Sequence, residues 1–308
     1  MLSVGVVGVG RWGRNHVRVL KELEVEGLVN LKLVVDVDES RARMIADEFK
    51  IPHYSTCVED VSKYCDAAIV SVPIEHLYST SRLLIDDGIH VLVEKPVACS
   101  SSQILDLMNL AKSKSVVVMP GFIMRFNPAI MKLRNFIGSD VLYIFFRRLS
   151  RRSLQARKYS ILLDLAVHDI DLCMYMVGSL DLELLNSFVK YVDNYEICLI
   201  SLRCGNYICN IHVDDISNIK IREVDVVGKD FFIRCDTDSL SILYRYSKGV
   251  VNVEKVSGEE PLKMEDRVFI YLVSGKDVSD VPTLEHALQV LKIIEEISRI
   301  CSIKLIRD

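Results

Sequence analysis

The sequence has little glycine, proline and tryptophan, and it has no long apolar run. Its 308 residues include 14 Gly, 7 Pro and 1 Trp, which excludes collagen-like and low-complexity chains. No apolar run approaches the roughly 18 residues that a membrane span needs, so we expect no membrane partner. A basic excess is also lacking, because 38 Lys and Arg face 42 Asp and Glu. We therefore expect no nucleic-acid partner.

Cysteines in metal-binding or redox spacing are absent as well. The 9 Cys are scattered and form no C-x-x-C pair, so we expect neither a metal site nor a disulfide framework. Reduced cysteines inside apolar segments favour a cytoplasmic location. The first residues form a strand pattern without the basic and apolar regions of a signal peptide, which agrees with that location.

Hydrophobic residues make up 50% of the chain, enough for two buried cores at about 150 residues per domain. Residues 1–120 alternate short apolar strands with helical patterns, which is typical of a doubly wound parallel sheet. We expect strands at 2–8, 30–36, 66–72, 89–93 and 116–121, and helices near 12–24, 39–49, 76–87 and 101–114.

The pattern changes after residue 122 to long strands with alternating apolar residues. Such strands predict an α+β domain with a large open, mostly antiparallel sheet. We expect strands at 181–192, 195–203, 206–213, 222–227, 230–236 and 240–246, and helices near 127–137, 165–177, 260–273 and 284–301. The sequence thus predicts an α/β protein with one domain at 1–122 and a second at 123–308.

Gly8, Gly10 and Gly13 form a G-x-G-x-x-G turn between the first expected strand and the first helix. In this context the motif indicates a Rossmann domain that binds a dinucleotide. The glycines permit a tight turn, close approach to a pyrophosphate and close packing of the helix, whose N-terminus stabilises the anion. Arg11 and Trp12 lie within the turn, so we expect them to contact the cofactor.

Asp36 ends the second expected strand, about 20 residues after the turn, where a ribose-binding acid is usual. A carboxylate there accepts the ribose hydroxyls and repels a 2′-phosphate, which favours NAD over NADP. Arg11 and Arg41 are able to contact a 2′-phosphate, so NADP stays an alternative. Asp36 can also be read as an ordinary turn residue.

Two other segments carry titratable side chains. Lys95, within Glu94-Lys95-Pro96, follows the expected strand at 89–93, at the sheet edge where ligands bind. A lysine in a closed site exchanges protons near neutral pH. Asp164 and His168 share a face if their segment is helical, and an acid beside an imidazole raises its basicity. Read alone, Lys95 suits a surface lysine and His168 a core histidine.

Together the glycine turn, Glu94-Lys95-Pro96 and Asp164-x-x-x-His168 resemble the glucose–fructose oxidoreductase / inositol dehydrogenase (Gfo/Idh/MocA) family. The resemblance covers nearly the whole chain. It implies an NAD-dependent oxidoreductase that transfers a hydride from a sugar or polyol carbinol to nicotinamide. It also implies that Lys95, Asp164 and His168 are catalytic, with His168 as the acid/base and Asp164 as its partner.

The same resemblance implies binding residues and an assembly. The cofactor-binding positions that it adds are Val72, Pro73, His76, Glu94 and Lys95. The substrate-binding positions that it implies are Arg125, Asn127 and His168. From the residues alone, Arg125 and Asn127 equally suit a helix N-terminus, His76 suits a helix cap and His16 suits a structural role. Family members commonly form dimers or tetramers, so we expect a homo-oligomer.

Within that family, residues 10–16, 124–129, 163–172 and 220–228 most resemble the branch of UDP-N-acetylglucosamine 3-dehydrogenases. The chain departs from that branch in residues 150–160, which lack Gly and Pro. It departs again at Asp214 and Asp215, in a region where a tryptophan is usual. The resemblance implies a nucleotide sugar as the substrate.

A basic segment next to the predicted histidine helix gives an independent clue. Arg151, Arg152 and Arg157 lie within it, near Arg147, Arg148 and Lys158. Guanidinium groups suit bidentate recognition of phosphate, which favours a nucleotide-sugar substrate. A solvated loop or a subunit contact is the other interpretation. The alternative functions are dehydrogenation of a free polyol or monosaccharide, of the inositol type, and a non-catalytic NAD-binding regulator.

Overall fold

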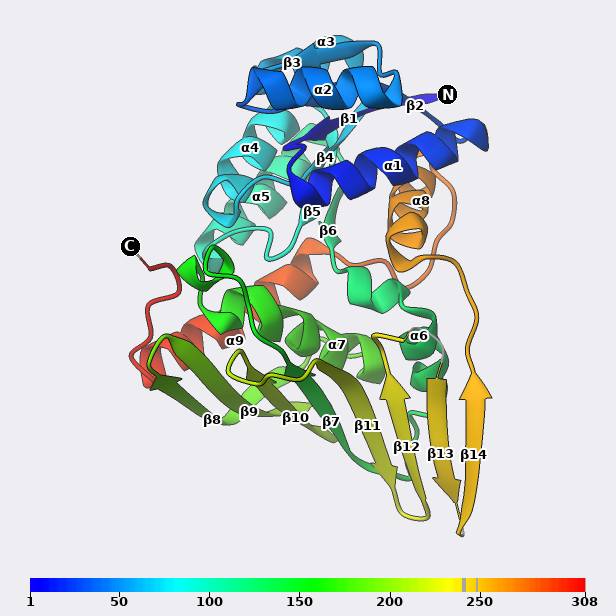
Figure 1. Cartoon of the computed structure of the whole chain (residues 1–308), viewed down its shortest axis with the longest axis vertical. Coiled ribbons are helices and arrows are strands. Elements are labelled where there is room, and N and C mark those ends of the chain that lie inside the picture. Colours follow the sequence, from blue (N-terminus) through cyan, green and yellow to red (C-terminus); the bar gives the residue numbers. More distant parts are fainter. Residues whose placement is uncertain (240–241, 248, 308) are drawn as a thin grey trace. The chain divides into compact units, whose positions relative to one another are not determined.

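The computed structural model describes residues 1–239, 242–247 and 249–307, which fold into two compact units (Figure 1). The first unit comprises Met1–Ile123 and Leu262–Leu288, and the second Met124–Pro261 and Gln289–Asp308. The structure thus places residues 262–288, which we expected in the second domain, in the first unit. The predicted α/β class, with a parallel and a mostly antiparallel sheet, is confirmed. No helix among the described residues is long and apolar enough to span a membrane.

The first unit contains a six-stranded parallel sheet in the order β3-β2-β1-β4-β5-β6. Its strands are β1 (Leu2–Val7), β2 (Val29–Val35), β3 (His53–Ser55), β4 (Ala67–Val70), β5 (His90–Glu94) and β6 (Val118–Gly121). All four residues of β4 are buried, as expected for a parallel strand that is covered on both faces. Strand β3, which is only 3 residues long, is not among the strands that we expected from the sequence.

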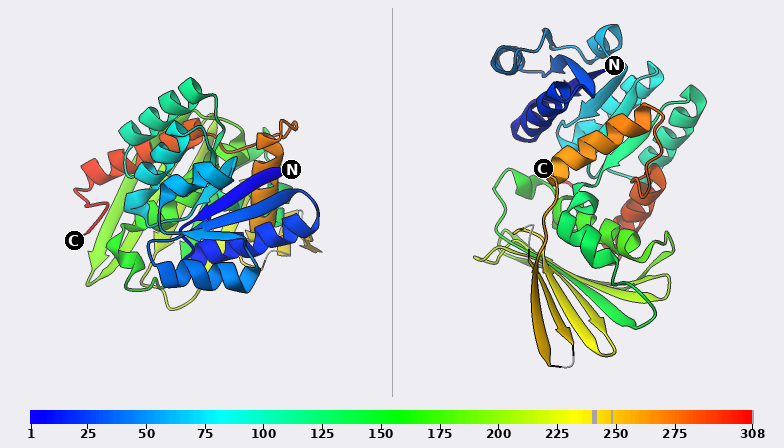
Figure 2. Two further views of the ribbon diagram at one scale, coloured as in Figure 1. Left: turned by 90° about the horizontal axis from the view of Figure 1, so that it is seen from above. Right: turned by 90° about the vertical axis from the view of Figure 1, so that its right-hand side faces the viewer.

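Helices alternate with these strands and cover the sheet (Figure 2). They are α1 (Arg11–Val25), α2 (Glu39–Phe49), α3 (Val61–Tyr64), α4 (Ile74–Asp86) and α5 (Ser101–Lys114). Right-handed crossovers put α1 and α2 on one face and α4 and α5 on the other, because the strand order reverses between β1 and β4. Ligands of open α/β sheets bind at the carboxyl ends of the strands at such a reversal. A further helix, α8 (Pro261–Val273), lies beside α1.

The second unit contains an eight-stranded sheet in the order β14-β13-β12-β11-β7-β10-β9-β8. Its strands are β7 (Val141–Leu149), β8 (Leu182–Val192), β9 (Tyr195–Cys204), β10 (Tyr207–Asp214), β11 (Ile221–Gly228), β12 (Phe231–Asp236), β13 (Ile242–Ser247) and β14 (Val250–Lys255). Strands β7 and β10 pair in parallel and the other neighbours are antiparallel. Strands β7 and β14 are not among the strands that we expected from the sequence. The strand expected at 240–246 corresponds to β13, except that residues 240 and 241 lie outside the described part.

Helices α6 (Pro128–Arg134) and α7 (Val167–Val177) pack on one face of this sheet, and α9 (Leu284–Ile300) enters the unit at Gln289 (Figure 1). The inward side chains of the central strands, such as Ile144, Phe146 and Val226, are fully buried. The opposite face carries the exposed apolar side chains Tyr143, Phe188 and Leu199.

All of the cysteines are free thiols. Burial raises the pKa of Cys65, Cys204 and Cys235 to about 12, because a thiolate loses its hydration in an apolar core. These thiols therefore behave as small apolar side chains near neutral pH.

Candidate functional site

The glycine-rich turn between β1 and α1 has the geometry that a bound pyrophosphate requires. Gly8 has a φ of +84°, and a Cβ there would lie 2.6 Å from the carbonyl oxygen of Ser71. A Cβ at Gly13 would lie 1.8 Å from the carbonyl oxygen of Gly8, so α1 packs this closely only without a side chain. A Cβ at Gly10 would meet nothing within 4 Å, which leaves open space at the helix N-terminus. The turn therefore fits a dinucleotide.

Asp36 follows β2 and connects to the glycine turn through hydrogen bonds. Its Oδ2 accepts the backbone N–H of Val9 at 2.9 Å, and its Oδ1 accepts from Arg41 Nη1 at 3.0 Å. The carboxylate is almost fully buried, whereas the side chain of Arg41 is 43% exposed. An acid next to the turn suits the ribose hydroxyls of NAD. The neighbouring Arg41 is the group that would favour the 2′-phosphate of NADP.

The segment after β4 reaches the same sheet edge as the glycine turn. A Cβ at Gly8 would lie 2.9 Å from Cγ1 of Val72, so the two residues are in close contact. Pro73 precedes α4, and its carbonyl oxygen accepts the backbone N–H of His76 at 2.8 Å. The side chain of His76 is exposed. Val72, Pro73 and His76, which are predicted cofactor residues, thus follow the carboxyl end of β4, and Val72 contacts the turn that follows β1.

Glu94 ends β5, and its carboxylate accepts three hydrogen bonds. Its Oε1 accepts from Trp12 Nε1 at 2.6 Å and from His16 Nε2 at 3.1 Å. Its Oε2 accepts the backbone N–H of Lys95 at 3.1 Å. The Lys95–Pro96 peptide bond is cis, and Lys95 is half-buried. The structure therefore brings Trp12, Glu94 and Lys95 together beside the glycine turn.

His168 lies in the first turn of α7, directly after a π-helical segment, Leu162–Ala166. Asp164 belongs to that segment, so the α-helical spacing that we expected between the two residues is replaced by a wider turn. Segments of π-helix are rare and are frequent at functional sites. The side chain of Asp164 is 22% exposed and its Oδ2 lies 3.5 Å from Arg152 Nη1. His168 is half-buried.

Two acids of α7 are held by arginines of the second unit. Arg148 donates to both oxygens of Asp169, at 2.8 and 2.7 Å. Arg125 donates to both oxygens of Asp171, at 2.8 and 2.6 Å. Burial raises the pKa of Asp171, and the ion pair with Arg125 opposes that shift. These bidentate pairs fix the orientation of the helix that carries His168.

The Arg125–Asn127 motif serves the fold of the second unit. Arg125 is 3% exposed and its guanidinium is engaged by Asp171. Asn127 is the N-cap of α6, and its Oδ1 accepts the backbone N–H of Ala129 at 3.0 Å. Its Nδ2 donates to the carbonyl oxygen of Thr237 at 2.9 Å. These contacts favour the helix N-terminus interpretation over contact with substrate.

The basic segment divides into inward and outward side chains. Arg152 is buried, and it donates to Glu196 Oε2 at 2.7 Å and to Asp215 Oδ2 at 3.0 Å. Arg157 Nε lies 3.5 Å from Asp215, and Arg151 is exposed. Arg147 likewise pairs with acids of β11. Arg152 therefore holds the segment to the sheet, whereas Arg151 is open to a ligand.

Several residues with clear structural connections to these sites were not selected from the sequence. Asp266 contacts His16, and Glu196 with Asp215 contacts Arg152. No local pattern marks these acids, because their partners are distant in the sequence. The described residues contain no cluster of three or more His, Cys, Asp or Glu side chains suited to a metal ion.

Comparison with known proteins supports the interpretation of the first unit as a dinucleotide-binding domain. Residues 2–122 match the family model described as an oxidoreductase family with an NAD-binding Rossmann fold. A stretch of 178 residues is 26% identical to the UDP-N-acetylglucosamine 3-dehydrogenase of Acidithiobacillus ferrooxidans, covering 58% of this chain and 55% of that protein. A stretch of 186 residues is 28% identical to myo-inositol dehydrogenase Hyg17 of Streptomyces leeuwenhoekii, covering 58% and 56%. The match thus spans about half the length of these relatives.

Solved structures match over nearly the whole chain. The structure of UDP-N-acetylglucosamine 3-dehydrogenase from Acidithiobacillus ferrooxidans superposes with a TM-score of 0.85 at 20% identity, covering 97% of both chains. A levoglucosan dehydrogenase in complex with NADH and levoglucosan superposes with a TM-score of 0.82 at 16% identity, again over 97% of both. At these identities the similarity establishes the fold.

Proposed function

We propose that this protein is an NAD-dependent dehydrogenase of sugars, because residues 2–122 match the model of the Gfo/Idh/MocA oxidoreductase family with its NAD-binding Rossmann fold. The observation that carries the proposal is the sheet edge at β1, β2 and β5, where the glycine turn, Asp36 and Lys95 lie. The open space at Gly10 suits the pyrophosphate. The carboxylate of Asp36 suits the ribose, which favours NAD over NADP.

In the proposed reaction a secondary alcohol of the sugar loses the proton of its hydroxyl group and a hydride from the carbon that bears this group, and it becomes a ketone. NAD, when bound, supplies the acceptor for the hydride. His168 takes the hydroxyl proton, and the negative charge of Asp164 favours the imidazolium that results. Lys95 donates a hydrogen bond to the hydroxyl oxygen and stabilises the negative charge that develops there.

The proposed substrate is a nucleotide sugar of the UDP-N-acetylglucosamine type. A relative with that activity is 26% identical over 178 residues. Arg151 and Lys158 are exposed beside the segment that carries Asp164, and they supply cations for a diphosphate. A free polyol or monosaccharide is the second candidate, because the buried acids Glu196 and Asp215 already engage Arg152.

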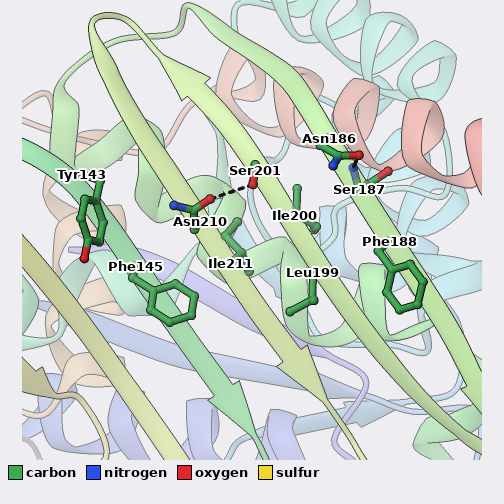
Figure 3. Close-up of a pocket in the computed structure, with 10 residues that line it drawn as sticks. All are labelled: Tyr143, Phe145, Asn186, Ser187, Phe188, Leu199, Ile200, Ser201, Asn210 and Ile211. Carbon is green, nitrogen blue, oxygen red and sulfur yellow. Dashed lines mark hydrogen bonds between the residues drawn. The ribbon is translucent and has the colours of Figure 1, made fainter.

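The outer face of the eight-stranded sheet supports a homo-oligomer, either a dimer or a tetramer. Tyr143, Phe188 and Leu199 are 40%, 53% and 44% exposed on this face. They line a hollow of about 520 Å³ together with other residues of β7, β8, β9 and β10. Figure 3 shows these side chains on the four strands. Because large apolar side chains grouped on a surface mark contact sites, we propose that a second copy of the chain covers this face.

The proposal is tested by mixing purified protein with stoichiometric NAD and UDP-N-acetylglucosamine and following nicotinamide reduction by absorbance. We expect one rapid turnover, which is lost in His168→Ala. The control His53→Ala, which removes an exposed histidine of β3, retains it. Reduction with myo-inositol instead supports the second candidate. If bound NAD is reduced by neither compound nor by other sugars, the dehydrogenase proposal fails and a non-catalytic NAD-binding regulator replaces it.

A further inference from the structure

A buried histidine in the first unit lies between two carboxylates. The side chain of His16, on α1, is fully buried. Its Nδ1 lies 2.9 and 3.1 Å from the two oxygens of Asp266, on α8, and its Nε2 lies 3.1 Å from Oε1 of Glu94. An ionised carboxylate only accepts hydrogen bonds, so both ring nitrogens donate and the ring carries a proton on each. The arrangement is an imidazolium between two acids.

The charge on His16 agrees with its surroundings. Burial alone would lower the pKa of His16, but Asp266 and Glu94 together raise it well above its usual value. These two carboxylates, one from α8 and one from the end of β5, are the charged groups that act on the ring. The indole of Trp12 also approaches it edge-on, with ring centroids 6.4 Å apart.

Glu94 connects the buried His16 to the residues at the carboxyl edge of the parallel sheet. The oxygen that accepts from His16 also accepts from the indole of Trp12, and the other oxygen accepts the backbone N–H of Lys95. Gly121 allows β6 to approach closely, since a Cβ there would lie 3.3 Å from Cδ of Glu94. The orientation of the Glu94 carboxylate therefore fixes the positions of both Trp12, in the glycine turn, and the backbone of Lys95.

Helix α8 is itself firmly attached to α1. Lys263 lies 3.0 Å from Glu22 and 2.9 Å from Glu26, and Arg267 lies 2.8 Å from Glu26. Asp266 lies on the same helix and contacts His16 on the buried side of α1. A residue far along the chain thus reaches a site built from the first strands.

We propose that Asp266 and His16 are positioning residues for the cofactor-binding edge: they fix the carboxylate of Glu94, and through it Trp12 and the backbone of Lys95. The catalytic consequence rests on the proposed dehydrogenase function, whereas the structural linkage does not. Neither residue contacts the reacting atoms in this proposal. A misplacement of about 1 Å at a catalytic group can reduce the rate about a hundredfold, so a loss of this linkage affects kcat.

The test uses the emission of Trp12, which is the 1 Trp of the chain and therefore a specific probe of this linkage. Emission is measured without substrate from about pH 5.5 to about pH 8, a range that includes the usual histidine pKa of about 6.5. In the wild type we expect no transition, since His16 stays protonated. In Asp266→Asn the ring loses a neighbouring charge and burial lowers its pKa, so the emission maximum shifts as pH rises.

The same substitution is also tested by its effect on kcat. In Asp266→Asn we expect kcat at about pH 8 to fall roughly ten- to a hundredfold, with little change in KM for the sugar. At about pH 5.5 the reprotonated ring restores both kcat and the emission to wild-type values. Lys263→Met is the matched control, because it weakens the attachment of α8 without touching His16, and it leaves emission and kcat unchanged.

Two results would overturn the proposal. One is a folded Asp266→Asn variant with wild-type emission and kcat throughout the pH range. The other is an equal effect of Lys263→Met, which would reduce the role of Asp266 to stability. If Asp266→Asn does not fold, His16→Gln replaces it and is expected to show the shifted emission at every pH, with wild-type emission refuting the linkage. Failure of the wild type to turn over would reject only the dehydrogenase function, because the emission test needs no substrate.

Discussion

Replacing Arg152 with methionine is expected to destabilise the second unit. Arg152 is buried between Glu196 and Asp215, and the side chains of both acids are fully buried. Methionine preserves much of the apolar stem but removes the charge and all donors. The two carboxylates then keep their negative charge in the protein interior with fewer compensating groups.

The size of the destabilisation depends on the contacts that Glu196 and Asp215 keep in the variant. Glu196 still accepts the backbone N–H of Ile161 at 2.8 Å, and its Oε1 lies 2.6 Å from Arg307 Nη2 in an ion pair. Asp215 still accepts the backbone N–H of Glu196 at 2.6 Å and lies 3.5 Å from Arg157. Removing one partner of a buried ion pair costs about 3–5 kcal/mol, and these donors favour the lower end, about 3 kcal/mol. For a unit of this size, that lowers Tm by roughly 6–12 °C.

Thermal unfolding followed by far-ultraviolet circular dichroism measures this effect, since Trp12 lies in the first unit and does not report on the second. Arg151→Met is the matched control. Its side chain is exposed, so its stability change should stay within about 0.5 kcal/mol. If Arg151 contacts the diphosphate, its variant raises KM for a UDP-sugar at unchanged Tm. An unchanged Tm of Arg152→Met together with a large loss of UDP-sugar affinity would refute the reasoning and restore Arg152 to phosphate recognition.

Three other changes test the remaining assignments. Gly13→Ala is expected to abolish NADH binding in isothermal titration, because the new Cβ would lie 1.8 Å from the carbonyl oxygen of Gly8; normal binding would contradict the tight turn. Asp36→Ala should raise the preference for NADP over NAD roughly ten- to a hundredfold in kcat/KM, because Arg41 loses its acidic partner and a hydrogen bond to a charged group is worth about 1.5–3 kcal/mol. Phe188→Asp should lower the mass seen in sedimentation equilibrium to that of the monomer, and an unchanged mass would place the subunit contact elsewhere.

The first unit was well predicted because its strands are apolar and regularly separated by helices. The pattern that placed a strand at 89–93 corresponds to β5 at His90–Glu94, and the pattern for a helix at 101–114 coincides with α5. The one missed strand, β3, is too short to show any period. Helix α8 was also predicted, but nothing in its sequence indicates that it lies beside α1 and not within the second unit.

The second unit was predicted less completely, since its central strand has an ambiguous pattern. Strand β7 reads Val-Leu-Tyr-Ile-Phe-Phe-Arg-Arg-Leu, and a short apolar run of this kind suits a strand or a buried helix equally. The arginines of β7 also favoured the interpretation of this part of the chain as a ligand-binding segment. In the sheet they alternate: Arg147 pairs with acids on β11, whereas Arg148 points inward to Asp169 on α7. The π-helical turn at Asp164 was invisible as well, because no residue type marks it.

The roles of charged residues were harder to predict than the positions of strands. The spacing of apolar residues indicates which positions are buried, but it does not indicate which residue pairs with a buried charge. The sequence around Arg152 contains several basic residues, so Arg152 resembles a phosphate-binding residue. The acids that neutralise it are distant in the sequence: one lies in β9 and the other directly follows β10. Asp266 is 250 positions from His16 and belongs to no motif. A buried charge is stable only beside an opposite charge, so such distant acids fix where the motif residues point. Substitutions at Glu196 or Asp266 should therefore change the behaviour of Asp164 or Lys95 while every recognisable motif stays intact.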